Sequence, residues 1–353
     1  MFILVSIALV EALTHFGAMP GDHPQYFNVT KFFLGQEPLI TKVRIVRPLV
    51  PLLAAPFSLV MPLPYAYGVV NTAFYLLTGV ACYALTLKLT KSKLTALYSG
   101  VLVLTSFPMI AYGAASSKEG AGLFFQMLAA LLALKLAEGK GVVKALAYGL
   151  IAGVGMLSME IVIPAVAFGL LLLSRNRMFK EAAAWLITAV LPSVFVGALF
   201  NYSIISWYLQ GGIEYASKLG LLSLSAWFNP SLRLRHLVEG LSPFVCLFMV
   251  VGLAKLRGEA NTVNLFVLMI IPGVAAYFAW PPVTSRQVIT MSYAIYWVAA
   301  RGLASLGKKP WIQVTLLLVN AILCNYLAFK WYSTCFYLET LGPWKGFSVP
   351  WPP

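Results

Sequence analysis

Long apolar segments separated by short polar loops make up most of this 353-residue chain. A helix needs about 20 predominantly apolar residues to cross a hydrocarbon core roughly 30 Å thick. The pattern predicts about eleven membrane-spanning helices, in the segments 2–18, 65–88, 94–113, 119–137, 142–157, 160–174, 182–204, 242–256, 263–280, 286–305 and 310–329. We therefore expect an all-α protein, a multi-pass bundle of transmembrane helices.

A further apolar stretch, 48–61, is shorter and contains Pro48, Pro51 and Pro56. About 14 residues do not easily cross the hydrocarbon core, and proline disfavours a continuous helix. We therefore expect a juxtamembrane or re-entrant helix on the outer face. If this stretch did cross, only the preceding loop, 19–47, would change sides, so the loop pattern leaves both arrangements open.

Composition places the chain among integral membrane proteins. Hydrophobic residues make up 60% of it and charged residues 10%, whereas charged residues make up roughly a quarter of a soluble domain. The four cysteines show no CxxC spacing, which favours small buried hydrophobes over a zinc or disulfide framework. The first apolar segment follows Met1 without a basic stretch, which favours a retained helix over a cleaved signal peptide.

Many of the basic residues behind the formal net charge of +14 recur in short loops between apolar segments. This is the positive-inside pattern, and it indicates membrane lipids rather than nucleic acid as the partner. Five such loops fall on one predicted face: Lys91/Lys93, Lys140/Lys144, Arg175/Arg177/Lys180, Lys255/Arg257 and Lys308/Lys309. With 48–61 not crossing, the N-terminus is predicted to be cytoplasmic, in a plasma membrane or, in a eukaryote, the endoplasmic reticulum membrane.

The opposite, outer face is predicted to hold the long loops. They are 19–47, 114–118, 205–241 and 281–285, followed by a tail, 330–353, that is rich in tryptophan and tyrosine. Such aromatic residues gather at membrane interfaces. We divide the chain into a transmembrane catalytic-type module, 1–329, and an outer-face aromatic tail, 330–353.

The first outer loop contains Asp22, the only aspartate in the chain, followed by His23 and Tyr26 and by a basic stretch that ends at Arg47. A carboxylate beside an apolar wall loses hydration, which raises its pKa and makes it a better base. The same pattern also fits a structural role, in which Asp22 caps a surface helix and Arg47 extends its charge to the interface.

Glu119 opens the segment after the second outer loop. The macrodipole of a helix stabilises a carboxylate in its first turn, which is one explanation. Alternatively, Asp22 and Glu119 converge on one outer cavity and hold a divalent cation or share acid–base work. No His or Cys spacing indicates zinc, and the metal question stays open.

Three further features carry charge at or near the predicted outer boundary. Glu160 lies in the tight turn between the segments 142–157 and 160–174, where it is either a site residue or a surface residue. Arg286 lies at the outer mouth of a late segment, where a planar guanidinium suits a lipid phosphate. Glu11 and His15 are four residues apart and share one helix face, where they are expected to pair.

These residues together resemble the GT-C class of membrane glycosyltransferases, which use polyprenyl-phosphate-linked sugars as donors. The matching features are Asp22 with Tyr26, the stretch Arg47-Pro48-Leu49-Val50-Pro51, the acidic Glu119 and the late Arg286. Their order and predicted sidedness fit over about residues 1–305. Each motif is short, so the resemblance rests on the arrangement.

The resemblance implies a GT-C-like fold and transfer of a sugar, a hexose or a pentose, on the outer face. Asp22 would be the base that activates the acceptor, Glu119 a second acidic residue of the site, with or without a metal, and Arg286 the ligand of the donor phosphate. Substrate binding would involve His23, Tyr26, Arg47 and Glu160. The first loop offers Asp-His where several families in the class have Asp-Glu, which leaves metal dependence undecided. The short tail favours a small or lipid-linked acceptor.

Two other functions remain compatible with the sequence. A transporter or flippase for lipids or small solutes would carry charged residues near the middle of several spans, and only Glu11 and His15 approach that description. A non-catalytic GT-C-like subunit of a membrane complex would share the architecture, because a fold does not fix a function. The sugar, the acceptor and any protein partner cannot be identified from the sequence.

Overall fold

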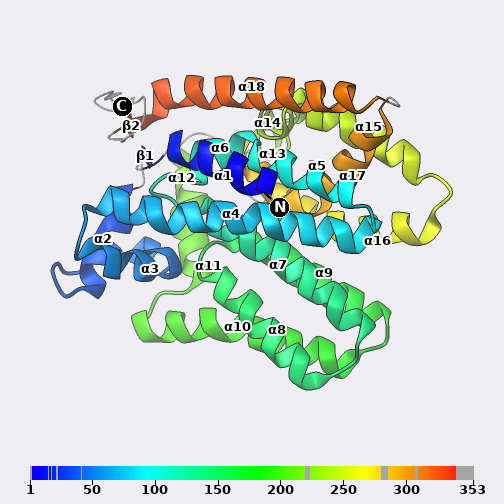
Figure 1. The fold of residues 1–353 in the computed structure, drawn as a ribbon. Coiled ribbons are helices and arrows are strands. Elements are labelled where there is room, and N and C mark those ends of the chain that lie inside the picture. The colour runs from blue at the N-terminus through cyan, green and yellow to red at the C-terminus, as the bar shows by residue number, and fades with distance from the viewer. Residues whose placement is uncertain are drawn as a thin grey trace.

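The computed structural model describes residues 2–14, 16, 18–20, 23–40, 42–218, 223–279, 285–306 and 309–338. Asp22 and His15 lie outside these ranges, as do residues 339–353 of the predicted tail. The described residues form a helical bundle with one small ribbon (Figure 1). In the ribbon, β1 (Ala18–Pro20) pairs antiparallel with β2 (Phe336–Leu338) and so joins the first loop to the end of the last helix.

The bundle consists of helices of very different length. In chain order they are α1 (Phe2–Thr14), α2 (His23–Phe33), η1 (Lys42–Arg44), α3 (Leu49–Ser58), α4 (Leu63–Thr90), α5 (Lys93–Leu104), α6 (Phe107–Tyr112), α7 (Glu119–Glu138), α8 (Val142–Met156), η2 (Glu160–Val162), α9 (Ile163–Arg175), α10 (Phe179–Phe200), α11 (Ile204–Trp207), η3 (Tyr208–Ile213), α12 (Glu214–Lys218), α13 (Leu224–Trp227), α14 (Pro230–Leu241), α15 (Pro243–Leu256), α16 (Ala260–Ala279), η4 (Ser285–Met291), α17 (Ser292–Ser305) and α18 (Pro310–Cys335).

Each of the predicted spans contains at least one helix, but the helices differ in whether they are long enough to cross a membrane. Among the described residues, five helices are long and apolar enough to do so, namely α4, α7, α10, α16 and α18, and the pair α14 and α15 makes a sixth if its 94° bend lies within one span. The protein is therefore a multi-pass membrane protein. The count of eleven spans, the orientation and the compartment stay predictions.

Several element boundaries differ from the predicted ones. The segment 94–113 is divided into α5 and α6 at Thr105 and Ser106. Residues 285–291 form the tight helix η4 before α17 begins at Ser292. Helix α18 continues to Cys335, beyond residue 329, the predicted end of the last span.

The proline-containing stretch 48–61 forms α3, which is 10 residues long. At about 1.5 Å per residue, such a helix covers only about half of a hydrocarbon core. Val50 and Ala54 are buried in a cluster with Tyr26 of α2 and Tyr67 of α4. The length of α3 agrees with the expected juxtamembrane helix.

Glycines allow two helix pairs in the bundle to approach closely. A Cβ atom on Gly302 of α17 would lie 1.9 Å from the Phe248 carbonyl oxygen of α15, and one on Gly252 of α15 would lie 2.1 Å from the Val298 carbonyl oxygen. Gly149 of α8 likewise faces the backbone of α10. Small residues serve this purpose at helix contacts in membranes, because lipid supplies no hydrophobic force between helices.

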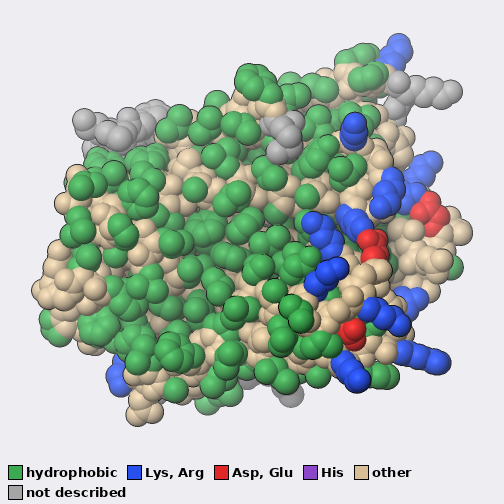
Figure 2. Space-filling model, turned by 60° about the horizontal axis from the view of Figure 1, so that its bottom comes forward, with side chains coloured by type: hydrophobic (Ala, Val, Ile, Leu, Met, Phe, Trp, Pro, Cys, Tyr) green, Lys and Arg blue, Asp and Glu red, His purple; other side chains and the backbone are tan. Residues whose placement is uncertain are grey.

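On one face of the molecule, many charged side chains gather at one end (Figure 2). Figure 2 shows most of the visible lysines and arginines together there, with few acidic groups among them. Two ion pairs, Lys88–Glu138 and Arg301–Glu259, join side chains that lie next to the short turns between helices. Helices α2 and α3 lie at the opposite end of α4 from its turn into α5 (Figure 1). The basic turns and the first loop are thus separated by the length of the bundle.

Candidate functional site

An arginine of the first loop is buried in the interior of the bundle. Arg47 lies in the turn between η1 and α3, and its side chain is 3% exposed. Its Nη1 atom donates to the Tyr26 hydroxyl at 3.2 Å, and its Nη2 atom lies 2.6 Å from Oε2 of Glu160. Because Glu160 opens η2, this ion pair joins the first loop to the turn between α8 and α9.

Arg47 stays charged in this environment. Burial lowers the pKa of its guanidinium, but the Glu160 carboxylate raises it, followed by Tyr26 and Glu119, and the net result is a pKa above the ordinary value. The Glu160 side chain is 21% exposed. Removing one partner of such a largely buried ion pair destabilises a protein, because the remaining charge is left without compensation.

The second loop, 113–118, is entirely buried. The Asn71 amide of α4 donates to the carbonyl oxygen of Ala115 and, at 3.1 Å, to that of Ser117. The Thr78 hydroxyl, two turns further along α4, donates to the Gly120 carbonyl oxygen at 3.1 Å. A buried loop needs such partners for its backbone polar groups. Helix α4 therefore fixes the position at which α7 begins.

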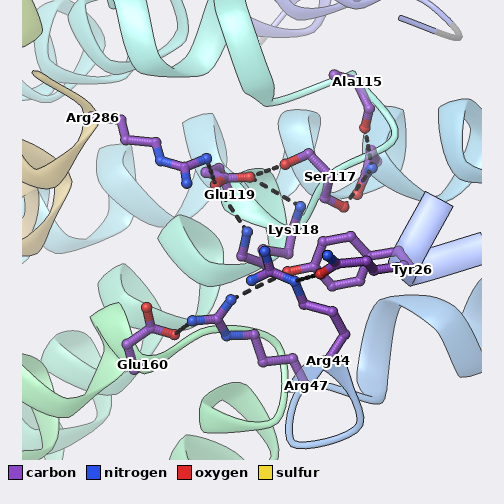
Figure 3. A network of polar contacts seen from close by, with 11 residues as sticks. Tyr26, Arg44, Arg47, Ala115, Ser117, Lys118, Glu119, Glu160 and Arg286 are labelled. Atoms are coloured by element: carbon purple, nitrogen blue, oxygen red, sulfur yellow. Dashed lines mark hydrogen bonds and ion pairs between the residues drawn. The ribbon is translucent and has the colours of Figure 1, made fainter. Parts of the chain in front are cut away.

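Glu119, the first residue of α7, is completely buried, with 0% of its side chain exposed. Its Oε2 atom accepts hydrogen bonds from the Ser117 hydroxyl and from the Lys118 backbone N–H at 3.1 Å. Its Oε1 atom lies 3.3 Å from Nζ of Lys118 and 3.2 Å from Nη1 of Arg286. The carboxylate is thus held by two cations and two further donors (Figure 3).

The cations of this network also lie over aromatic rings. Nζ of Lys118, a side chain only 2% exposed, lies 5.0 Å from the centre of the Tyr26 ring. The guanidinium of Arg44 lies 5.3 Å from the same ring, and that of Arg286 lies 5.3 Å from the Tyr112 ring. Aromatic faces attract cations, and they hold them without neutralising their charge.

The described residues of the network include more cations than carboxylates. In the part of the chain that the structure describes, four cations (Arg44, Arg47, Lys118 and Arg286) meet two carboxylates (Glu119 and Glu160), an excess of two positive charges. A site of one sign, walled by apolar helices, attracts ligands of the other sign. This arrangement suits an anion such as a phosphate.

Five of the predicted site residues therefore lie in one network: Tyr26, Arg47, Glu119, Glu160 and Arg286 (Figure 3). They come from α2, the turn before α3, α7, η2 and η4. His23 opens α2, and its ring lies edge-on to Phe27, with 5.1 Å between the ring centres. Asp22 directly precedes His23 and lies outside the described residues.

Glu11 lies apart from this network. Its Oε1 atom accepts a hydrogen bond from the Asn325 amide of α18 at 3.0 Å. Because His15 lies outside the described residues, the expected pair of Glu11 with His15 stays a prediction.

Sequence reasoning missed Lys118, Ser117 and Arg44. Lys118 directly precedes Glu119 in a short loop between two apolar segments, and a lysine that cannot leave an apolar wall must find an anion or an aromatic ring. This position in the sequence was the signal from which Lys118 could have been predicted as a site residue. The hydroxyl of Ser117 and the approach of Arg44 to Tyr26 depend on the folded loops.

The described residues do not fit a divalent metal. Both oxygens of Glu119 already face hydrogen-bond donors, two of them cationic. No group of three His, Cys, Asp or Glu side chains comes together within the described ranges. The carboxylate environment here is that of an ion pair rather than that of a metal ligand.

Comparison with known proteins rests on the fold. Neither a protein-family model nor the sequence of a curated protein matches the chain. Among solved structures, it is similar to ArnT from Cupriavidus metallidurans bound to undecaprenyl phosphate, with a TM-score of 0.63 and 13% identity. That match covers 94% of this chain and 65% of ArnT.

A second similar structure is the Archaeoglobus fulgidus oligosaccharyltransferase tethered with an acceptor peptide, with a TM-score of 0.54 and 11% identity. The match covers 93% of this chain and 55% of that one. The fold is GT-C-like. At these identities the likeness concerns the fold, and the chain spans about two thirds or less of the proteins that it resembles.

We expect the Arg47–Glu160 pair to be strongly coupled. In unfolding titrations with SDS in detergent micelles, Arg47→Met and Glu160→Gln should each destabilise the protein. The double variant should lose about 1 to 3 kcal/mol less than the sum of the two, because no uncompensated charge remains. The exposed pair Glu214–Lys218 provides the control cycle, in which the coupling should fall within experimental error. Additive losses at Arg47 and Glu160 would contradict the ion pair.

Proposed function

We propose that this protein is a membrane glycosyltransferase that moves a sugar from a polyprenyl-phosphate donor to an acceptor hydroxyl on the outer face. The observation that carries the proposal is the gathering of four cations among the described residues around Glu119 and Tyr26, in a GT-C-like bundle. The similar ArnT structure is bound to undecaprenyl phosphate, which supports a donor of this class.

Sugar transfer from a phosphate needs cationic support for the leaving group, because negative charge develops on the departing oxygen. Arg286 is the proposed ligand of this phosphate. Its side chain is 30% exposed, the largest exposed fraction among Arg47, Lys118 and Arg286. Its planar group can offer paired hydrogen bonds to phosphate oxygens. The buried Lys118 adds a second positive charge near the proposed phosphate position.

The reaction also needs a base for the incoming hydroxyl. Asp22 is the proposed base, since it directly precedes the helix that carries Tyr26. It would take the acceptor proton as the acceptor oxygen bonds to the anomeric carbon, while the bond from that carbon to the phosphate oxygen breaks. The phosphate would leave on the lipid, held by Arg286. His23, next to Asp22, is proposed to contact the substrate.

The remaining predicted residues are proposed to hold the first loop and the cations in place. Arg47 contacts both Tyr26 and Glu160 and so holds the first loop against the bundle. Glu119 contacts both Lys118 and Arg286 and is completely buried. We therefore propose that Glu119 positions the cations, in place of the acid–base or metal role that the resemblance implied.

Asp22→Asn is expected to lower sugar transfer by about 10² to 10⁴, the usual contribution of a general base. Synthetic undecaprenyl-phosphate sugars are added to native membranes, which supply the acceptor, and release of undecaprenyl phosphate above that of membranes lacking the protein is measured by mass spectrometry. Glu37→Gln, which removes an exposed carboxylate of the same loop, is the control and should release lipid at the wild-type rate. Full activity of Asp22→Asn would remove Asp22 from the mechanism. A transporter or a non-catalytic subunit would release no lipid phosphate in any variant.

Arg286→Ala is expected to weaken binding of undecaprenyl phosphate at least about tenfold, since a charged hydrogen bond to the phosphate is lost. Affinity can be measured by quenching of tryptophan fluorescence in detergent micelles. Arg235→Ala is the matched control, because Arg235 is exposed and pairs with Glu239 on its own helix. If Arg286→Ala and Arg235→Ala bind the lipid equally well, Arg286 does not hold the phosphate.

A further inference from the structure

The donors around Glu119 are of the kinds that proteins use to bind a phosphate. They comprise a serine hydroxyl, a backbone N–H at the start of a helix, a lysine and an arginine. Helix N-termini and arginine–oxyanion pairs are standard features of phosphate sites. Here the anion that receives them is the chain's own carboxylate.

The partners of Glu119 differ in how readily each could leave the carboxylate for a ligand. Ser117 and Lys118 are its neighbours in the chain, and Lys118 is almost fully buried. Arg286 comes from η4, a segment distant in sequence, and its contact with Glu119 uses one nitrogen, Nη1, at 3.2 Å. Arg286 is also the least buried member of the cluster, with 30% of its side chain exposed. It is therefore the partner that can turn to a ligand while the rest of the cluster stays in place.

We propose that Glu119 stands in for the donor phosphate while the site holds no lipid, and that the phosphate takes Arg286 over from Glu119 when it binds. Glu119 then keeps Lys118 and Ser117. This inference rests on the proposed function and concerns the regulation of the same site.

Competition by Glu119 has a consequence for turnover. The sugar donor is a phosphodiester with a single negative charge, whereas the released lipid phosphate is a monoester with a charge of about −1.5 to −2 at pH 7. Cations that hold the donor would hold the product more tightly. A carboxylate that reclaims Arg286 weakens both interactions and thereby helps the product to leave.

The test compares the affinity of purified protein for undecaprenyl phosphate in three forms: wild type, Glu119→Gln and Glu259→Gln. Glu259 pairs with Arg301 near a turn at the basic end, so its replacement changes the net charge equally without touching the site. We expect Glu119→Gln to bind undecaprenyl phosphate at least about tenfold more tightly than wild type, because Arg286 no longer has to leave a carboxylate. Glu259→Gln should bind it within about twofold of wild type.

The outcomes separate the inference from the function on which it rests. If wild type binds undecaprenyl phosphate no better than uncharged undecaprenol, the proposed function fails, and the inference fails with it. If wild type binds the phosphate but Glu119→Gln binds it equally or more weakly, the inference alone is overturned. Equal gains in Glu119→Gln and Glu259→Gln would also overturn it, since net charge alone would then explain the effect.

Because Glu119 is buried between two cations, Glu119→Gln could fail to fold, and a second measurement on wild type avoids this. A cryo-electron microscopy structure with undecaprenyl phosphate bound should show the Arg286 guanidinium on the phosphate and more than about 4 Å from the Glu119 carboxylate. Lys118 should remain on Glu119. Arg286 still paired with Glu119 in the lipid-bound protein would overturn the inference.

Discussion

The burial of one carboxylate at the start of α7 determines much of this structure. An ionised group removed from water is tolerated only when it is paired and hydrogen-bonded. Glu119 meets that condition through Ser117, Lys118 and Arg286, with no part of its side chain exposed. The requirement brings η4, from the C-terminal third of the chain, against a loop that α4 holds in place.

A second ion pair extends this arrangement to the first loop. Arg47 contacts Glu160 and the Tyr26 hydroxyl, and the ring of Tyr26 in turn lies near Lys118. Segments far apart in sequence are thereby fixed to one another at a single place among apolar helices. Among the described residues four cations and two carboxylates gather there, so the interactions that hold the loops together also concentrate positive charge at this place. On the proposed function, the stability of the loops and the affinity for a phosphate have a common origin.

Much of the fold could be predicted because apolar length alone identifies helices in a membrane protein. Glu119, Glu160 and Arg286 could be singled out because each is a charged residue at the edge of an apolar segment. The contact of Glu119 with Arg286 joins residues 167 positions apart, and no local pattern encodes it. The start of α17 was predicted too early because residues 285–291 form a tight helix, which carries Arg286. The bend between α14 and α15 occurs at Ser242, whose positive φ of 73° no apolar pattern reveals.

The central claim is that a lipid phosphate binds where the first loop, the second loop and η4 meet. Photolabelling tests it most directly. A polyprenyl phosphate with a diazirine beside the phosphate would be irradiated with the wild-type protein in lipid nanodiscs, and the labelled peptides would be mapped by mass spectrometry. The account predicts adducts within residues 23–47, 112–119 and 285–291 that excess undecaprenyl phosphate suppresses. Adducts confined to the exposed face of α10 or to the basic turns, or adducts that are not suppressed, would contradict it.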